Sequence, residues 1–186
     1  MQRIKAIDPQ TARGKVKELL DAVQAKLGLT PNIVRTMAAS PAVLEAYLNF
    51  GGAVAKGALS AKLREQIALI VGETNQCGYC LAAHTAIGSQ VGLTEEAIVG
   101  ARRGIAGNSR DAAILQFARE MVKARGALTD EDLNHLRGVG VSDGEIAEIV
   151  ANVALNLFTN YFNHVAGTVV DFPPAPTLHG THLHAC

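Results

Sequence analysis

The 186-residue chain contains no tryptophan, only five phenylalanines and three tyrosines, and only three cysteines. A secreted disulfide scaffold needs more cysteines in a shorter chain, so this class of protein is excluded. No run of about 18 consecutive apolar residues occurs, so we expect no membrane-spanning helix. Neither sign of charge dominates, with Lys+Arg 17 against Asp+Glu 17, and the nearest thing to a basic cluster is Arg102-Arg103. Nucleic-acid binding rests on clustered Lys and Arg, so we expect no nucleic-acid partner.

What the chain does contain is enough apolar material to fold. Apolar residues make up 48 % and charged residues 18 %, which excludes a disordered chain. The length suits one domain with a sizeable core. The first eight residues lack the apolar core of a signal peptide, so we expect a cytoplasmic protein.

Residues typical of helix starts and helix ends recur along the whole sequence. Two capping boxes are predicted, Thr129 with Asp132 and Ser142 with Glu145. Helix starts are predicted at Thr30-Pro31, Ser40-Pro41, Ser60, Thr94, Ser109, Thr129 and Ser142. Helix stops are predicted at Gly28, Gly57, Gly72, Gly92, Gly107, Gly126, Gly138 and Gly167. Apolar residues recur at three and four between these marks, and no segment alternates with period two. The sequence therefore predicts an all-α bundle of eight to nine helices.

The last predicted helix has an unusual polar side. Its apolar stripe comprises Ile146, Ile149, Val150, Val153, Leu157, Tyr161 and Val165. Four asparagines line its polar side, Asn152, Asn156, Asn160 and Asn163, and no charged residue occurs from Val150 to Val165. Either the helix is buried within its own domain, or this face packs on another subunit, where charge is depleted. We favour the subunit contact.

Helix signals fade after Gly167. The segment from Asp171 to Pro176 is rich in proline and predicts an extended arm. We expect a single domain over residues 1–173 and a flexible tail over residues 174–186. The tail holds His179, His182, His184 and Cys186, to which we assign no function.

The segment whose side chains could carry out a reaction is Cys77-Gly78-Tyr79-Cys80. A lone C-x-x-C is either a redox dithiol or half of a zinc site, whose other ligands would be His84, His135, His164 or the tail cluster. The polar run Glu73 to Gln76 ends one helix and the next begins near the cysteines. The dithiol is therefore predicted at a helix N-terminus, where free N–H groups and the macrodipole stabilise a thiolate.

A histidine follows the second cysteine by four residues. Cys80 and His84 at i and i+4 share one helix face, so the imidazole can take the thiol proton directly or through one water. A carboxylate usually orients such an imidazole, and Glu65 and Glu73 are the candidates. The bland interpretations are a core histidine, a solvated Glu65 and a Tyr79 that only packs.

These residues carry a resemblance to the alkylhydroperoxidase D / carboxymuconolactone decarboxylase family, and more closely to its peroxidase-related branch. The motif E-x(11)-C-x-[HY]-C-x(3)-H is met by Glu65, Cys77, Tyr79, Cys80 and His84. The resemblance covers roughly residues 25–173. It includes Leu29 to Val34, Ala39 to Pro41, Phe162 to Thr168 and Asp171 to Pro173.

The resemblance implies an AhpD-like helical fold, a trimer or hexamer, and a thiol peroxidase with peroxiredoxin-like antioxidant activity that needs no metal or haem. In the family, the cysteine matching Cys80 attacks the peroxide, and the one matching Cys77 resolves the sulfenic acid to a disulfide, which an external dithiol reduces. Residues matching His84 and Glu65 form the proton relay. The best-studied members carry histidine at the position of Tyr79. A phenol with a pKa of about 10 is no base at pH 7, but it can donate a hydrogen bond to a sulfenate or peroxide oxygen.

Two alternatives stay open. One is decarboxylation of a muconolactone-like acid, although family members with that chemistry generally lack the dithiol. The other is a non-catalytic redox-sensing or zinc-holding oligomer, for which Cys77, Cys80 and His84 supply only three of four ligands. For the peroxidase we expect Cys80 to lie deeper than Cys77, with His84 within one water of it.

Overall fold

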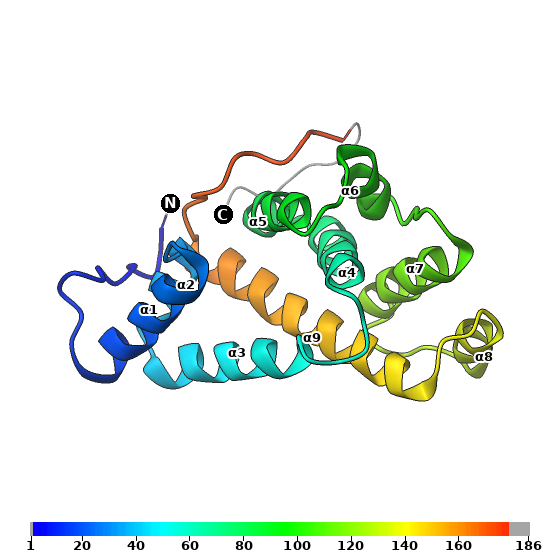
Figure 1. Cartoon of the computed structure of the whole chain (residues 1–186), viewed down its shortest axis with the longest axis horizontal. Coiled ribbons are helices and arrows are strands. Elements are labelled where there is room, and N and C mark those ends of the chain that lie inside the picture. Colours follow the sequence, from blue (N-terminus) through cyan, green and yellow to red (C-terminus); the bar gives the residue numbers. More distant parts are fainter. Residues whose placement is uncertain (1, 179–186) are drawn as a thin grey trace.

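The computed structural model describes residues 2–178, which form nine helices and no strand, as the sequence predicts for an all-α protein (Figure 1). The helices are α1 (Gly14–Leu27), α2 (Asn32–Met37), α3 (Pro41–Val54), α4 (Ala61–Thr74), α5 (Gly78–Gln90), α6 (Glu95–Arg102), α7 (Ser109–Lys123), α8 (Asp130–Gly138) and α9 (Asp143–Ala166). No described helix combines the length and the apolar character that crossing a membrane requires.

Most helix starts lie where the capping residues predict them. Ser40, Ser60 and Thr94 each accept a hydrogen bond from the backbone three residues on. Both predicted capping boxes form, at the starts of α8 and α9. The cap of α7 is Asn108, one residue before the predicted Ser109. Local side-chain chemistry therefore sets most of the helix boundaries.

Glycine predicts helix ends less well than capping residues predict starts. Gly28 and Gly167 are left-handed C-caps, as expected. Gly72 instead lies inside α4, which continues to Thr74. A Cβ at Gly72 would meet the Leu81 side chain at 3.4 Å and the Cys80 Cβ at 3.7 Å. Gly72 therefore faces α5 from within α4 and does not end the helix.

Helix α9 is the central element of the molecule. It packs against α3, α4, α5 and α7, and Figure 1 shows it passing between α3 and α4. Its first half joins a core built from α4 and the helices α6 to α8. A second core gathers α1, α2, α3 and the start of α5, including both cysteines. The dithiol thus lies where the N-terminal helices meet the rest of the fold.

The asparagine face of α9 is buried within the chain itself, so the favoured prediction of a subunit contact at this face is wrong. Asn152, Asn156, Asn160 and Asn163 are all buried. Three residues of the predicted apolar stripe do not face the core, because Val150, Tyr161 and Val165 are exposed. A long uncharged helix carries apolar residues around its whole circumference, so spacing alone does not reveal which face is inside.

Residues 168–178 form an extended C-terminal strap across the N-terminus of α2 and the helices α5 and α6 (Figure 1). The Asn32 side chain donates to the Val169 carbonyl, and the buried Arg102 donates to the Pro176 carbonyl at 2.5 Å. Leu178 is buried. Packing therefore continues past the expected boundary at residue 173, while the predicted tail cluster lies outside the described residues.

Candidate functional site

The dithiol is positioned by a tight turn between α4 and α5. Gln76 adopts a left-handed backbone with φ 57°, and the Cys77 N–H donates to the Gly72 carbonyl at 2.9 Å. Cys77 is the N-cap of α5, and its Sγ accepts the Cys80 N–H at 3.4 Å. The two sulfurs are 2.6 Å apart. The sequence prediction of a dithiol at a helix N-terminus is confirmed.

Only one of the two sulfurs faces a cavity. Cys77 is 0 % exposed and Cys80 is 2 % exposed. Cys80 lines a cavity of about 140 Å³, which Cys77 does not reach. The prediction that Cys80 lies deeper is therefore wrong, because the N-cap residue lies beneath the helix start. One turn into α5, Cys80 faces the cavity that the N-terminal helices cover.

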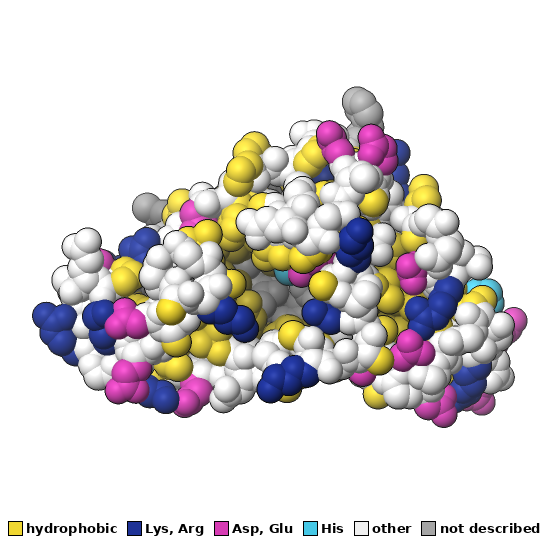
Figure 2. Space-filling model, in the orientation of Figure 1, with side chains coloured by type: hydrophobic (Ala, Val, Ile, Leu, Met, Phe, Trp, Pro, Cys, Tyr) yellow, Lys and Arg dark blue, Asp and Glu magenta, His cyan; other side chains and the backbone are white. Residues whose placement is uncertain are grey.

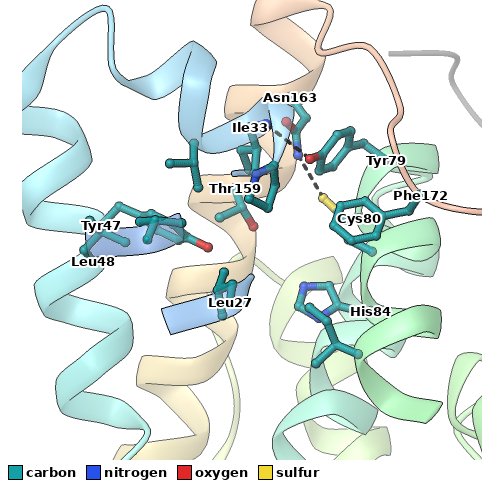
Figure 3. A pocket seen from close by; sticks show the side chains of 15 residues that line it. Leu27, Ile33, Tyr47, Leu48, Tyr79, Cys80, His84, Thr159, Asn163 and Phe172 are labelled. Carbon is teal, nitrogen blue, oxygen red and sulfur yellow. Dashed lines mark hydrogen bonds between the residues drawn. The ribbon is translucent and has the colours of Figure 1, made fainter. Parts of the chain in front are cut away.

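The cavity wall beside Cys80 carries an imidazole held by a carboxylate. His84 lines the same cavity, and its Nδ1 lies 2.7 Å from Glu65 Oε2. Both side chains are mostly shielded, at 22 % and 17 % exposure. Figure 3 shows His84 below Cys80 on the same helix. The other candidate partner, Glu73, lies 2.7 Å from the buried Arg102 Nε, which identifies Glu65 as the orienting carboxylate.

Tyr79 contacts the cavity with its ring and the C-terminal strap with its hydroxyl. The hydroxyl accepts the Ile33 N–H at 3.2 Å and donates to Asp171 Oδ1 at 2.8 Å. Burial, with a further contribution from the negative Asp171, holds the pKa of Tyr79 well above its ordinary value. The Phe172 ring meets the Tyr79 ring edge-on, at 5.8 Å between centroids. The hydroxyl proton is thus engaged by Asp171 rather than by either sulfur.

The cavity adjoins a second, larger one. A second cavity of about 340 Å³ shares Leu27, Tyr47, His84, Ile87 and Thr159 with the first, and it is also lined by Arg64 and Glu65. Figure 2 shows the corresponding hollow near the centre of one face, with basic side chains at its rim. In Figure 3 the Tyr47 hydroxyl points into this space from α3. Burial raises the pKa of Tyr47 to about 12, so its hydroxyl is a neutral donor at physiological pH.

One residue that touches the dithiol was not among the predicted site residues. Asn163, on α9, donates from Nδ2 to Cys80 Sγ at 3.2 Å and lines the first cavity (Figure 3). In the sequence, Asn163 belongs to the uncharged asparagine row and to the segment from Phe162 to Thr168 that resembles the family. Eighty-three positions separate Asn163 from Cys80, so no local pattern links them.

A zinc site would need several ligand side chains close together. Among residues 2–178, no group of three or more His, Cys, Asp or Glu side chains is arranged to hold a metal ion. Of the other ligands considered, His135 lies on α8 and His164 on α9.

Comparisons with known proteins show a family resemblance and the fold. Residues 41–130 match the model of the carboxymuconolactone decarboxylase family. None of the curated proteins matches the chain. One similar solved structure is the alkylhydroperoxidase AhpD core of an uncharacterized peroxidase-related protein from Ralstonia eutropha JMP134, with 24 % identity and a TM-score of 0.83 over 91 % of this chain and 92 % of that one. Another is an uncharacterized peroxidase-related protein from Silicibacter sp. TM1040, with 25 % identity and a TM-score of 0.78 over 97 % and 96 %.

A third similar structure is named for a different activity. It is a cysteine-to-alanine variant of the debrominase Bmp8 in complex with 2,3,4-tribromopyrrole, with 19 % identity and a TM-score of 0.79 over 92 % of each chain. At this identity the likeness shows the fold alone. Residues 41–130 resemble the carboxymuconolactone decarboxylase family, and the chain has the AhpD-like helical fold.

Proposed function

We propose that the protein is a thiol-dependent hydroperoxidase that cycles between the Cys77/Cys80 dithiol and a disulfide. The observation that carries this proposal is the position of Cys80, which lines a cavity together with an imidazole held by Glu65. Cys77 lies directly behind Cys80, 2.6 Å away between sulfurs, where a resolving thiol belongs. The likeness to two peroxidase-related structures supports the same class of reaction.

The reaction proceeds in two balanced steps. His84 takes the Cys80 proton, and the thiolate attacks the terminal oxygen of a hydroperoxide ROOH. The S–O bond forms, the O–O bond breaks, and His84 returns the proton to the leaving alkoxide, which gives ROH. Cys77 then attacks the Cys80 sulfenic acid, and the hydroxyl leaves with the Cys77 proton as water. The dithiol has lost two electrons, and the peroxide has gained them.

The cavity favours an organic hydroperoxide over hydrogen peroxide. Its lining is mainly aliphatic and aromatic, with Ile33, Val34, Leu48 and Phe172 among the side chains that surround Cys80. Such a wall stabilises an apolar R group by burying it. An external dithiol restores the enzyme, which fits a reducing compartment such as the cytoplasm. The cycle calls for no metal or other cofactor.

The two remaining residues of the motif have supporting roles in this proposal. Glu65 holds the imidazole in one orientation and stabilises its protonated form. Tyr79 acts as a positioning residue, because its hydroxyl joins α5 to the strap through Asp171. Its ring remains part of the cavity wall.

The decisive experiment measures consumption of cumene hydroperoxide with dithiothreitol as reductant. We expect Cys80→Ser to abolish turnover, and Cys77→Ser, oxidised in the absence of dithiothreitol, to stop at the Cys80 sulfenic acid without forming the Cys77–Cys80 disulfide. Cys186→Ser, at the third cysteine of the chain, is the matched control and should retain the wild-type rate. Equal rates for wild type and Cys80→Ser would refute the proposal. Metal analysis of the purified protein tests the zinc-holding alternative.

We also propose that the chain forms a homo-oligomer through the exposed side of α9 and the residues that follow it. Its exposed large hydrophobic side chains are Val150, Phe158, Tyr161, Val165, Val169 and Val170. An apolar face of this extent marks an association surface. Light scattering should give a trimer or hexamer for the wild type and a smaller species for Tyr161→Glu. An unchanged mass for Tyr161→Glu would place the interface elsewhere.

A second candidate function is reductive dehalogenation of a halogenated aromatic ring. The rings of Tyr47, Tyr79 and Phe172 line the Cys80 cavity, and they suit a flat substrate. The structural likeness to debrominase Bmp8 directs attention to this chemistry. The dithiol would supply two electrons and two protons, so that an aryl bromide and two thiols give the arene, bromide, a proton and a disulfide. Bromide release from 2,3,4-tribromopyrrole, lost in Cys80→Ser, would favour this activity over peroxide reduction.

A further inference from the structure

We propose that Asn163 is a catalytic residue whose amide N–H stabilises the Cys80 thiolate and whose amide oxygen accepts the O–H of the sulfenic acid formed there. The inference rests on Cys80 being the reacting sulfur of the proposed function. Its first half concerns the sulfur alone, and it can be tested without any peroxide.

The contact lies in a shielded part of the fold. Asn163 Nδ2 lies 3.2 Å from Cys80 Sγ, and Asn163 is 0 % exposed. A hydrogen bond to an ionised acceptor is roughly twice as strong as one between neutral groups. Burial strengthens it further, because little water screens the charge. An amide N–H held here therefore favours the thiolate over the thiol.

The other buried asparagines of α9 show that this orientation is particular to Asn163. Asn152 and Asn156 donate their amides to the carbonyls four residues earlier on the same helix, at 2.8 Å each. Asn160 accepts from the Asn75 side chain. Asn163 alone of the four directs its amide at a sulfur, so a purely structural role in α9 does not account for its contact.

The second half of the proposal follows from the other end of the same amide. Asn163 Oδ1 is buried and has no hydrogen-bond partner among the described residues. A buried acceptor without a donor costs free energy. The peroxide step supplies a donor, because the oxygen transferred to Cys80 Sγ carries a hydrogen once the O–O bond has broken. When Cys77 attacks Sγ, this hydroxyl leaves as water and the acceptor is free again.

The thiolate role is tested by the pH profile of Cys80 alkylation. Iodoacetamide labelling, read at the Cys80 peptide by mass spectrometry, gives the pH midpoint for wild type, Asn163→Leu and Asn163→Asp. We expect Asn163→Leu to raise the midpoint by about one pH unit and to slow labelling at pH 7 about ten-fold, as loss of a charge-assisted hydrogen bond implies. Asn163→Asp keeps the shape and loses the donor, so it shifts the midpoint in the same direction and serves where Asn163→Leu does not fold.

The control removes a matched buried asparagine that does not contact sulfur. Asn152→Leu loses only a bond to its own helix backbone, so its midpoint should equal that of wild type. The titratable groups around Cys80, which are Cys77, Tyr47, Tyr79 and His84, are retained in every variant. An unchanged midpoint in folded Asn163→Leu or Asn163→Asp would overturn the thiolate role.

The acceptor role is tested in a Cys77→Ser background, where the sulfenic acid cannot resolve. One equivalent of cumene hydroperoxide forms the sulfenic acid, and a second equivalent oxidises it to sulfinic acid. We expect this second oxidation to be several-fold faster with Asn163→Leu than without it. Equal rates overturn the acceptor role. If no sulfenic acid forms at all, the proposed function fails and the acceptor role fails with it. A shifted alkylation midpoint would still establish the contact between Asn163 and the thiolate.

Discussion

Replacing Tyr79 with phenylalanine removes one oxygen atom and tests whether this residue acts on the fold or on the sulfurs. The hydroxyl accepts the Ile33 N–H and donates to Asp171, whose second carboxylate oxygen accepts the Asn32 N–H at 2.7 Å. Three segments therefore meet at this oxygen: the start of α2, the start of α5 and the C-terminal strap. The ring remains in Tyr79→Phe, so the contact with Phe172 is retained.

The magnitude follows from what each partner loses. Ile33 is buried, so its N–H is left without an acceptor, at a cost of about 1–3 kcal/mol. Asp171 is exposed, so water replaces the lost donor at its carboxylate and the added cost is small. The buried N–H dominates, and we expect Tyr79→Phe to lower the free energy of unfolding by about 2 kcal/mol. For a chain of this length, that corresponds to a melting temperature lower by about 4–8 °C.

Urea unfolding followed by circular dichroism measures this loss, with Asp171→Ala and the double variant completing a cycle. We expect a coupling energy of about 1 kcal/mol between the two side chains. Alkylation of Cys80 in Tyr79→Phe should keep the wild-type rate, because the hydroxyl proton is directed at Asp171. Wild-type stability combined with a ten-fold change in the rate of Cys80 alkylation would refute this reasoning. The Tyr79 hydroxyl would then act on the sulfurs rather than on the fold.

Three further predictions concern the rest of the fold. Burial raises the pKa of both Tyr47 and Tyr79, so folding favours their neutral forms. Their contribution to the free energy of unfolding is therefore fully present below pH 10. At higher pH it is lost, by at most about 1.4 kcal/mol per pH unit for each tyrosine. Urea unfolding at pH 9 and pH 11 measures this slope, and Tyr47→Phe should reduce it; an identical slope would contradict the assignment. Gln76→Gly relieves the strain of a left-handed backbone and should raise the free energy of unfolding by about 0.5–1 kcal/mol. A lower free energy of unfolding in urea would show that the Gln76 side chain contributes more than the strain costs. Arg102→Met leaves Glu73 largely buried without its cation and should cost about 3–5 kcal/mol, and added Glu73→Gln should recover part of it; equal stabilities for the single and double variants would contradict this account.

The sequence predicted the local features of the site well, because they depend on residues near one another in the chain. Helix spacing places Cys80 and His84 on one face, and the structure has both lining one cavity. Serine and threonine caps predicted most helix starts for the same reason. The choice between Glu65 and Glu73 was beyond spacing, since it is decided by Arg102, which pairs with Glu73.

Features that depend on tertiary packing were not predictable from the chain alone. The asparagine row of α9 indicated an uncharged face, but a depleted charge is equally typical of a subunit contact and of the protein interior. Asn163 reaches Cys80 only because α9 packs on α5. Glycine at position 72 predicts a helix stop, but the residue lies inside α4 beside the Leu81 side chain.

The position of α9 in the chain has a consequence for biosynthesis. The helices α4 and α5, which bring the two cysteines together, leave the ribosome well before α9 does. Until α9 docks against α3, α4, α5 and α7, the Cys80 thiol lacks the wall that Asn163 provides. During synthesis, Cys80 therefore stays uncovered on this side until α9 has formed. Docking of α9, the last helix to be synthesised, therefore completes the wall around Cys80.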